Sequence, residues 1–403
     1  MLLKKALQQL ITAFKRVGSN VIYANPNRLI LQTTKTEVGN AYAYSKYILK
    51  SIKEKPLFHF LDIDIKEYWD YLIWYDEFNY GGKACQEVVE AENQELEAIM
   101  NWQISRFLPT PLQSVFVDWI VEYVEIMHGL KKPGAGQSEA DATPRQTQLP
   151  VRPEDESDSV EITSVLSQSF SKALKKQIAG LIRRQRDEML HPELASDYEF
   201  PSLPGAVPSK HERNPTLELV KYLMQILGLA KYTALEVRLL RRDLLTLFDI
   251  REFSDEGKFE SPSSSLVLTQ IICHNCTMAR DLDLCRDPEL LPDSGTENNA
   301  TTTLPPWTCP YCSTEYDRLF LEERVIGEVQ GLVMEWQAQD LKCAKCAGIM
   351  INPFMEHCSC SGEWVGTIDK RAIEKKLRVY QSIADFYGFK MLSMVTNGVL
   401  ESI

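Results

Sequence analysis

Eight closely spaced cysteines in the C-terminal part of the chain constrain the fold more than any other feature. They form four pairs, each separated by one or two residues: Cys273 with Cys276, Cys309 with Cys312, Cys343 with Cys346, and Cys358 with Cys360. Such a pair turns the backbone so that both thiolates face one ion, and two pairs complete a tetrahedral site. The spacing therefore predicts two metal sites, one built by the first two pairs and one by the last two.

Zinc is the metal that this donor set predicts, because four cysteine thiolates in a tetrahedron are a common structural zinc site. A closed four-thiolate site leaves no open coordination position, so both ions are expected to be structural rather than catalytic. For the site formed by the last two pairs, an iron–sulfur cluster stays an alternative, because four thiolates hold such clusters too.

Three other residues near the pairs are candidate ligands. Cys285 lies in the long insertion within the first site, and His274 and His357 each adjoin a cysteine. Because four cysteines already complete each site, we interpret Cys285 as a spare thiol and both histidines as polar neighbours. Cys85 stands alone in the sequence and is predicted to lie in the core, on a helix.

Composition limits the compartment and the class of partner. The chain has 403 residues, enough for two or three domains, and a formal net charge of −12. Phosphate binding requires an excess of Lys and Arg, so this charge argues against a protein that coats nucleic acid through bulk electrostatics. Neither a membrane-length apolar run nor a secretory signal is present, which predicts a soluble intracellular chain. Reduced thiols in that compartment favour metal ligation over disulfides.

Sequence patterning predicts an α+β fold that is mainly helical and has four segments. Residues 1–130 alternate helical and strand patterns, and residues 131–163 are rich in Pro, Gly and acidic residues, as a flexible linker is. Residues 164–265 are helical and end in a short linker over 252–265. Residues 266–403 hold the two cysteine modules, which a helix joins.

Apolar periodicity and helix-breaking residues indicate the individual elements. A β-hairpin is expected around Asn25-Pro26-Asn27, and one or two more strands between residues 58 and 82. The expected helices cover residues 7–14, 37–53, 83–128, 315–339 and 370–387, with a further one that starts at Asn214-Pro215.

The cysteine modules resemble those of a known polymerase family. The order of the four pairs, and the local sequences IICHNCTMARDLDLC, WTCPYC, LKCAKC and CSCSGEWVGT, are similar to the C-terminal modules of eukaryotic B-family replicative DNA polymerases, in particular the epsilon class. The resemblance covers residues 266–403. It implies that these modules dock the second, or B, subunit of the polymerase in the nucleus, and that the chain helps to tether the polymerase to the replicative helicase.

The N-terminal hairpin carries a second part of this resemblance. Active B-family polymerases have a Tyr-Gly-Asp-Thr-Asp-Ser turn whose two carboxylates bind magnesium. The similar hairpin here runs from Tyr23 to Arg28, and Asn25 and Asn27 stand at the carboxylate positions. An amide offers a neutral oxygen where a hard dication favours an anionic one. Residues 1–130 are therefore interpreted as the remnant of an inactivated palm and thumb, and Met1 as compatible with a fragment boundary, because earlier palm motifs are absent.

We expect a non-catalytic scaffold, with a zinc-dependent DNA-binding module or a nucleotidyltransferase fragment as the alternative. Two acidic pairs are weak candidates for catalysis: Asp62 with Asp64, expected on one strand face, and Asp76 with Glu77. Two basic helix faces could contact DNA but are more simply solvated: Lys172, Lys175, Lys176, Arg183, Arg184 and Arg186, and Lys370, Arg371, Lys375, Lys376 and Arg378. Three tryptophans either face a partner or pack inside their own modules: Trp307, Trp336 and Trp364.

Overall fold

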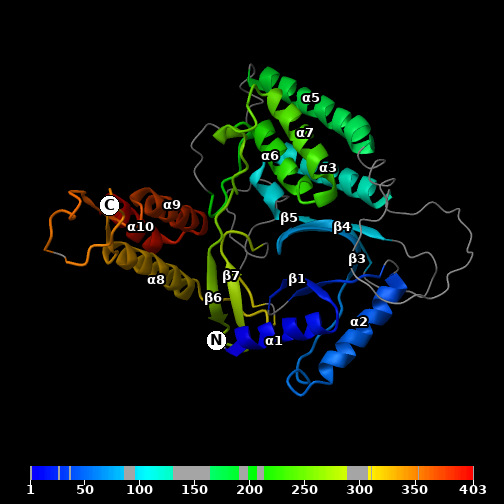
Figure 1. The fold of residues 1–403 in the computed structure, drawn as a ribbon, viewed down its shortest axis with the longest axis horizontal. Helices are drawn as coiled ribbons and strands as arrows, with labels where there is room; N and C mark the ends of the chain where they lie inside the picture. Colours follow the sequence, from blue (N-terminus) through cyan, green and yellow to red (C-terminus); the bar gives the residue numbers. More distant parts are fainter. Residues whose placement is uncertain are drawn as a thin grey trace, which may run out of the picture. The chain divides into compact units, whose positions relative to one another are not determined.

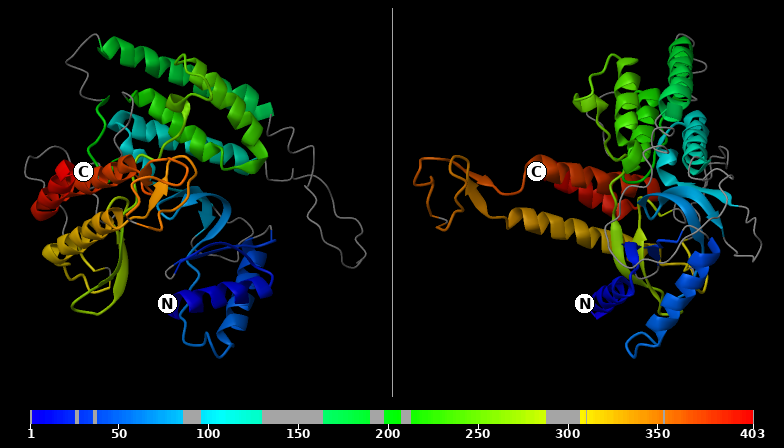
Figure 2. Two further views of the ribbon diagram at one scale, coloured as in Figure 1. Left: turned by 60° about the vertical axis from the view of Figure 1, so that its left-hand side comes forward. Right: turned by 45° about the vertical axis from the view of Figure 1, so that its right-hand side comes forward.

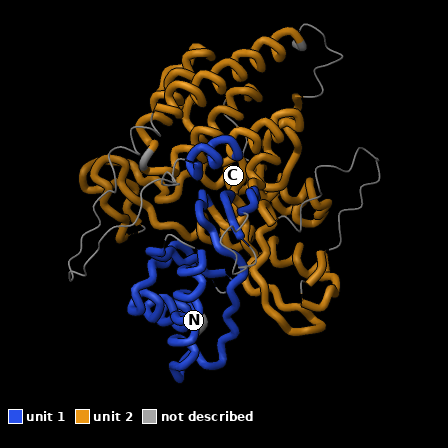
Figure 3. The backbone as a smooth tube through the Cα atoms, turned by 90° about the vertical axis from the view of Figure 1, so that its right-hand side faces the viewer, with its two compact units in different colours: residues 1–75, 80–101, 121–162 blue, residues 76–79, 102–120, 163–403 orange. Residues whose placement is uncertain are grey.

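The computed structural model describes residues 2–402, apart from 26–27, 36–37, 86–95, 130–163, 190–197, 207–212, 288–306, 310 and 353. The described part is mostly helical with small sheets, as the sequence predicts (Figure 1). It divides into two compact units, 1–75, 80–101 and 121–162 in one, and 76–79, 102–120 and 163–403 in the other (Figure 3). The predicted linker at 131–163 lies outside the described residues, and the four-segment division stays a prediction.

The first elements confirm the predicted helix–hairpin–helix order. Helix α1 (Leu2–Arg16) ends before Gly18, whose φ of 91° lies in the left-handed region that glycine enters most easily. Strands β1 (Asn20–Ala24) and β2 (Leu29–Gln32) pair antiparallel, and α2 (Val38–Lys53) follows. The core of this part is formed by the inner faces of α1 and α2, through residues that include Phe14, Ile48 and Ile52.

The prediction of a helix over 83–128 is wrong in its first half. Strands β3 (Tyr68–Asp76), β4 (Asn79–Cys85) and β5 (Glu97–Trp102) form a three-stranded sheet in that order, and only α3 (Thr110–Gly129) is an α-helix. Gly82 allows β4 to approach β3 closely, because a Cβ there would lie 1.9 Å from the Tyr71 carbonyl oxygen. Cys85 is buried, as predicted, but at the end of β4 rather than on a helix.

The two acidic pairs have ordinary structural surroundings. Asp62 and Asp64 lie in irregular chain before β3, so the prediction that they share a strand face is wrong. Asp76 closes the turn between β3 and β4, because its Oδ1 accepts bonds from the Phe78 N–H at 2.9 Å and from the Asn79 amide at 2.8 Å. A carboxylate held in this way serves the turn rather than a metal or a substrate.

Within its described residues the helical region contains three α-helices, as its sequence pattern predicts. They are α5 (Ser171–Met189), α6 (Pro215–Leu227) and α7 (Ala234–Thr246). The Asn214 side chain caps α6 as predicted, accepting from the N–H groups of Thr216 and Leu217. The segment predicted as a short linker after α7 is partly ordered, since it includes a 3-10 turn over Asp255–Gly257.

The described residues of the C-terminal part form two small hairpins and three long helices. Strands β6 (Val267–Ile272) and β7 (Ala279–Asp283) pair, as do β8 (Leu341–Cys343) and β9 (Trp364–Gly366). Helices α8 (Arg318–Gln337) and α9 (Lys370–Tyr387) confirm the prediction, whereas α10 (Lys390–Ser402) was not predicted. The three helices lie side by side (Figure 2) and share one apolar core. None of the helices in the described residues has both the length and the apolar character needed to cross a membrane.

The start of α10 is held by a buried acidic side chain. Glu322 of α8 is only 7% exposed, and its Oε1 accepts the Leu392 N–H at 3.0 Å. The first N–H groups of a helix lack partners within the helix, so a carboxylate there both satisfies a donor and complements the helix dipole. This bond joins α10 to α8 and completes the core on which the first cysteine module rests.

Candidate metal centres

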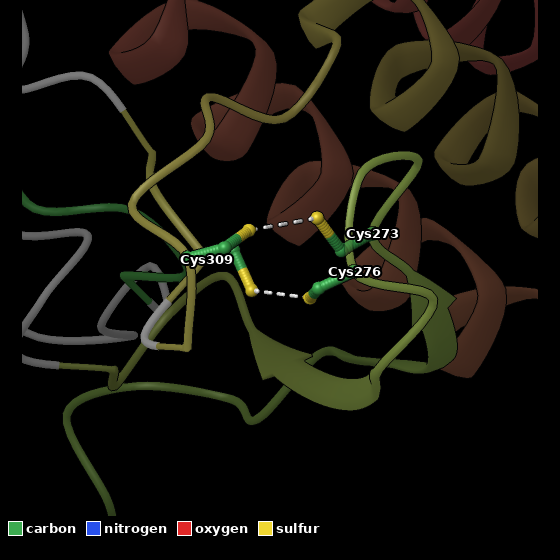
Figure 4. A group of neighbouring side chains, drawn as sticks. Cys273, Cys276 and Cys309 are labelled. Carbon is green, nitrogen blue, oxygen red and sulfur yellow. Dashed lines mark hydrogen bonds between the residues drawn. The ribbon is translucent and has the colours of Figure 1, made fainter.

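The first cysteine set consists of Cys273 and Cys276, after β6, and Cys309 and Cys312, before α8. Figure 4 shows the side chains of the two segments pointing toward one another. The Sγ atoms of Cys273 and Cys312 are 3.5 Å apart, as are those of Cys276 and Cys309. The two pairs thus come together, as the sequence predicts.

The second cysteine set consists of Cys343, Cys346, Cys358 and Cys360, between β8 and β9. The Sγ atoms of Cys343 and Cys360 are 3.3 Å apart, and those of Cys346 and Cys358 are 3.6 Å apart. The C-x-C pair therefore reaches the same arrangement as the C-x-x-C pairs.

A repeated backbone knuckle explains why all four pairs converge. In each knuckle the residue after the second cysteine has a positive φ near 57°: Thr277, Ser313, Ala347 and Ser361. The N–H of that residue donates to the carbonyl of the first cysteine, at 2.9, 2.8, 3.0 and 2.8 Å in the four cases. The bonds tighten the turn and aim both thiols to the same side, even where one residue fewer separates them.

One glycine leaves the space that the second set needs. A Cβ at Gly362 would lie 2.4 Å from the Cys343 Sγ and 3.3 Å from the Cys360 Sγ. At Gly348 the nearest atom, the Cys346 Sγ, would be at an ordinary 3.4 Å. Gly362 is therefore part of the site, although no spacing rule for cysteines includes it.

The thiol pKa values suit metal binding. The Thr314 hydroxyl, 3.3 Å from the Cys312 Sγ, helps to lower the pKa of Cys312 to about 6. The backbone N–H of Cys346 likewise lowers the pKa of Cys343 to about 6, whereas hydrogen bonding with the Cys343 thiol raises the pKa of Cys360 to about 12. Each set thus contains a thiol that ionises readily at neutral pH, and the thiolate is the form that binds metal.

The sulfur spacing is consistent with one zinc ion in each set. Four sulfurs bonded to zinc at about 2.3 Å lie about 3.8 Å from one another in a tetrahedron. In each set the four Sγ atoms all lie within 4.8 Å of one another. Among the described residues, only these two groups of His, Cys, Asp or Glu come close enough to hold an ion. Neither group includes His274, His357 or Cys285, in agreement with the interpretation of these residues as neighbours.

The two sets differ in burial. In the first, Cys273 and Cys309 are each 1% exposed and belong to the core shared with α8, α9 and α10. In the second, only Cys343 is buried, and the hairpin that carries the set extends beyond the helices (Figure 2).

Several apolar residues near the second set are exposed, and the sequence analysis did not predict this exposure. Ile351 is 96% exposed, Phe354 is 91% exposed and Ile349 is 60% exposed. All lie in the loop between the two cysteine pairs, where a module this small has little interior to bury them. The short length of this loop could have indicated from the sequence that its apolar residues would be exposed.

The tryptophans pack within their own region. Trp307 is 2% exposed, and its ring meets that of Tyr387 edge to face at 4.7 Å. Trp336 packs against the same core, and the Trp364 Nε1 donates to the Met355 carbonyl at 3.0 Å. Of the two interpretations offered by the sequence, packing inside the modules accounts for these contacts.

In the N-terminal hairpin, the side chains of Asn25 and Arg28 both contact tyrosines. The Asn25 amide donates to the Tyr23 hydroxyl at 3.1 Å, and the Arg28 guanidinium lies 5.1 Å from the Tyr80 ring centre. Asn27 lies outside the described residues. Both predicted basic faces, on α5 and α9, are largely exposed to solvent.

Comparisons with known proteins match the chain along most of its length. Residues 1–83 match a domain of unknown function, DUF1744, and residues 256–335 and 337–394 match two models described as the zinc finger domain of DNA polymerase-epsilon. The DNA polymerase epsilon catalytic subunit of Aspergillus fumigatus is 60% identical over 100% of this chain and 18% of that protein. Those of Saccharomyces cerevisiae and Schizosaccharomyces pombe are 36% and 35% identical over 97% and 99% of this chain.

The chain spans 18% or less of the length of these three relatives. Similarity nevertheless extends across nearly all of the chain, and both zinc-finger models cover a complete cysteine set. The chain therefore belongs to the DNA polymerase epsilon catalytic subunit family, in which it corresponds to the C-terminal region with DUF1744 and two zinc-finger domains.

Proposed function

We propose that this region is a non-catalytic assembly module of the leading-strand replicative DNA polymerase epsilon in the nucleus. Each cysteine set binds one structural zinc ion through its four thiolates. The second module docks the B subunit, and the region as a whole helps to tether the polymerase to the replicative helicase. The helicase link follows from the family resemblance alone.

The apolar loop of the second cysteine set carries this proposal. Ile351 and Phe354 are almost fully exposed, in the loop that joins the two cysteine pairs of the second set. Exposed aromatic and aliphatic residues on a rigid support are typical anchors of protein interfaces. A metal closed by four thiolates has no position for a substrate, so the module fits binding better than catalysis.

The proposed ions are zinc in both sets rather than an iron–sulfur cluster in the second. Sulfur atoms 3.3 Å and 3.6 Å apart leave room for one ion, whereas a cluster places several irons and sulfides between its cysteines. Gly362 supports this, because the backbone there closes directly on the Cys343 and Cys360 sulfurs.

Residues 1–130 are proposed to be an inactivated polymerase palm and thumb remnant. The hairpin of β1 and β2 supports this, because Asn25 and Asn27 replace the two carboxylates that active B-family polymerases use. The Arg28 side chain, stacked on Tyr80, adds positive charge where magnesium would bind. Neither feature would support two-metal catalysis.

Co-expression of the full chain with the polymerase epsilon B subunit tests the docking proposal. We expect stable capture by the wild type and its loss in Ile351→Ser/Phe354→Ser and in Cys358→Ser/Cys360→Ser. Leu319→Ser is the matched control, because Leu319 is 71% exposed on α8, away from the second set. Capture that survives both double variants would contradict docking through the second module.

Metal analysis of the same purified chain tests the zinc proposal separately. We expect two zinc ions per wild-type chain and one in the Cys358→Ser/Cys360→Ser variant. Stoichiometric iron with acid-labile sulfide after anaerobic purification would instead assign a cluster to the second set.

DNA binding by a basic face is the alternative function, because the lysines and arginines of α9 are exposed. It predicts an affinity that falls steeply with salt, as counterions are released for each phosphate contact. A salt titration of DNA binding by the wild type and by Lys375→Glu/Lys376→Glu distinguishes it from the assembly role.

A further inference from the structure

A second exposed apolar surface lies on helix α7, in the helical region. Leu235, Arg238, Leu239 and Arg242 are spaced by three, one and three residues, which places them on one side of the helix. Leu235 is 65% exposed and Leu239 is 43% exposed. The opposite side, with Val237, Leu240 and Leu244, is buried in the core. Helix α7 therefore has apolar residues on both sides, and among the described residues only one side packs into the core.

The exposed side continues beyond the helix through an ion pair. The Arg238 Nε lies 3.0 Å from the Glu252 Oε1, which holds the segment after α7 against the helix. The next residue, Phe253, is 77% exposed. We call Leu235, Arg238, Leu239, Arg242 and Phe253 the α7 stripe.

The charge of the α7 stripe is opposite to that of the whole chain. The side chains of Arg238 and Arg242 are 63% and 57% exposed. Asp243, which lies 3.6 Å from Arg242, is already engaged by Lys175 of α5 at 2.5 Å. The Arg242 side chain is thus more than half exposed and has no short ion pair with Asp243, in a chain whose formal net charge is −12.

We propose that the α7 stripe docks an acidic amphipathic helix of a partner protein. Exposed leucines at positions 235 and 239 match the one-turn spacing by which an amphipathic helix presents its own apolar residues. Arg242 beside them offers a bidentate bond to a carboxylate, which is stronger than a neutral hydrogen bond, while Arg238 is paired with Glu252 within this chain. Nucleic acid fits less well, because phosphates would pair with the arginines but leave the leucines without an apolar partner.

This surface is independent of the proposed zinc modules. The α7 stripe contains none of the eight clustered cysteines, and none of its residues belongs to the core that contains the first set. Loss of the second metal site should therefore leave binding at the stripe unchanged, so the two proposals can fail separately.

Fluorescence anisotropy of the full chain with designed peptides tests the proposal. The probe is a labelled amphipathic helical peptide with leucines on one face flanked by glutamates, and its counterpart has lysine in place of every glutamate. We expect tighter binding of the glutamate peptide, and about a tenfold loss of that affinity in Arg242→Glu, the scale of one charged hydrogen bond. Leu239→Ser should weaken the same peptide.

Two controls guard against trivial effects. Arg371→Glu reverses an exposed charge on α9 and should bind the glutamate peptide like the wild type. Each variant should retain the far-ultraviolet circular dichroism spectrum and the thermal unfolding midpoint of the wild type, which shows that the chain is folded. Equal binding of both peptides, no binding of either, or an Arg242→Glu effect matched by Arg371→Glu would overturn the proposal. Displacement of the peptide by a single-stranded oligonucleotide that itself requires Arg242 would also overturn it, in favour of nucleic acid.

Discussion

The two cysteine modules share one backbone design but have opposite relations to the rest of the chain. All four knuckles place a positive-φ residue after the second cysteine, and their sulfurs lie at similar distances. Yet the first set belongs to an apolar core with three helices, while the second stands on a hairpin with Ile351 and Phe354 exposed. The same arrangement of four cysteines thus lies in a domain core in one place and on a projecting hairpin with exposed apolar residues in the other.

What surrounds each set explains the difference. Trp307 directly precedes the second pair of the first set, and the Tyr387 hydroxyl donates to the Leu284 carbonyl at 2.7 Å, joining the β7 segment to α9. Among the described residues, the second set has no comparable apolar cover, and Ile349, Ile351 and Phe354 of its loop are exposed. Loss of metal should accordingly have different consequences at the two sites.

The largest expected effect is the loss of the first site. Cys273→Ser/Cys309→Ser should unfold the region of α8, α9 and α10, because a structural zinc contributes about 10–16 kcal/mol in zinc-finger peptides, as much as a whole domain's stability. Hydrogen exchange of the full chain measures this as lost amide protection in the three helices. Cys346→Ser/Cys358→Ser should leave that protection intact. Similar losses in both variants would break the distinction between the modules.

A smaller effect, confined to zinc affinity, is expected from substitution of Gly362 in the second site. Gly362→Ala places a methyl group on the Cys343 sulfur, so zinc affinity of the second set should fall about 10- to 100-fold, the scale seen for residues that support metal ligands. Competition with a chromogenic chelator gives the affinity. Gly348→Ala, where the added Cβ has normal clearance, is the matched control and should change it little. An unchanged affinity in Gly362→Ala would show that the hairpin can relax.

The next effect concerns stability alone. Glu322→Ala removes the buried acceptor of the Leu392 N–H and should lower the free energy of unfolding of the helical core by about 2 kcal/mol. Denaturant unfolding followed by near-ultraviolet circular dichroism measures it. Glu323→Ala, one residue away and exposed, should be nearly neutral. Because the second module lies outside this core, its zinc affinity should not change. A fall in that zinc affinity in Glu322→Ala would mean that the two modules are coupled.

The sequence predicted the cysteine grouping well because the signal is local. Knuckle geometry depends on a few consecutive residues, so the spacing of Cys343 and Cys346 is sufficient to indicate a turn toward metal. Strand β5 was missed because it is defined by pairing with β4, which local periodicity does not reveal. Gly362 was missed because its role depends on its contact with the sulfur of Cys343, nineteen residues earlier in the chain, and local sequence patterns do not reveal such contacts. Exposure of Ile351 depends on module size rather than on residue type.

The smallest expected effect is a shift in the pH at which the first site releases zinc. The pKa of Cys312 is lowered to about 6, with the Thr314 hydroxyl as the leading cause. A lowered pKa keeps the thiolate available as the pH falls, so protons displace zinc only at more acidic pH. Thr314→Val removes that hydroxyl and should raise the pKa of Cys312, moving zinc release from the first set to higher pH by up to about one unit.

Zinc release from the full chain on stepwise acidification, followed with a fluorescent zinc indicator, measures this shift. Thr314→Ser retains a hydroxyl and should restore the wild-type midpoint, which a purely structural role of the threonine would not require. The second set serves as an internal reference in the same sample, because Thr314 does not contact it. A shift in both sets would mean that acid unfolds the modules together. A shift confined to the first would show that each site sets its own proton competition, as expected of two modules with the same knuckles in different surroundings.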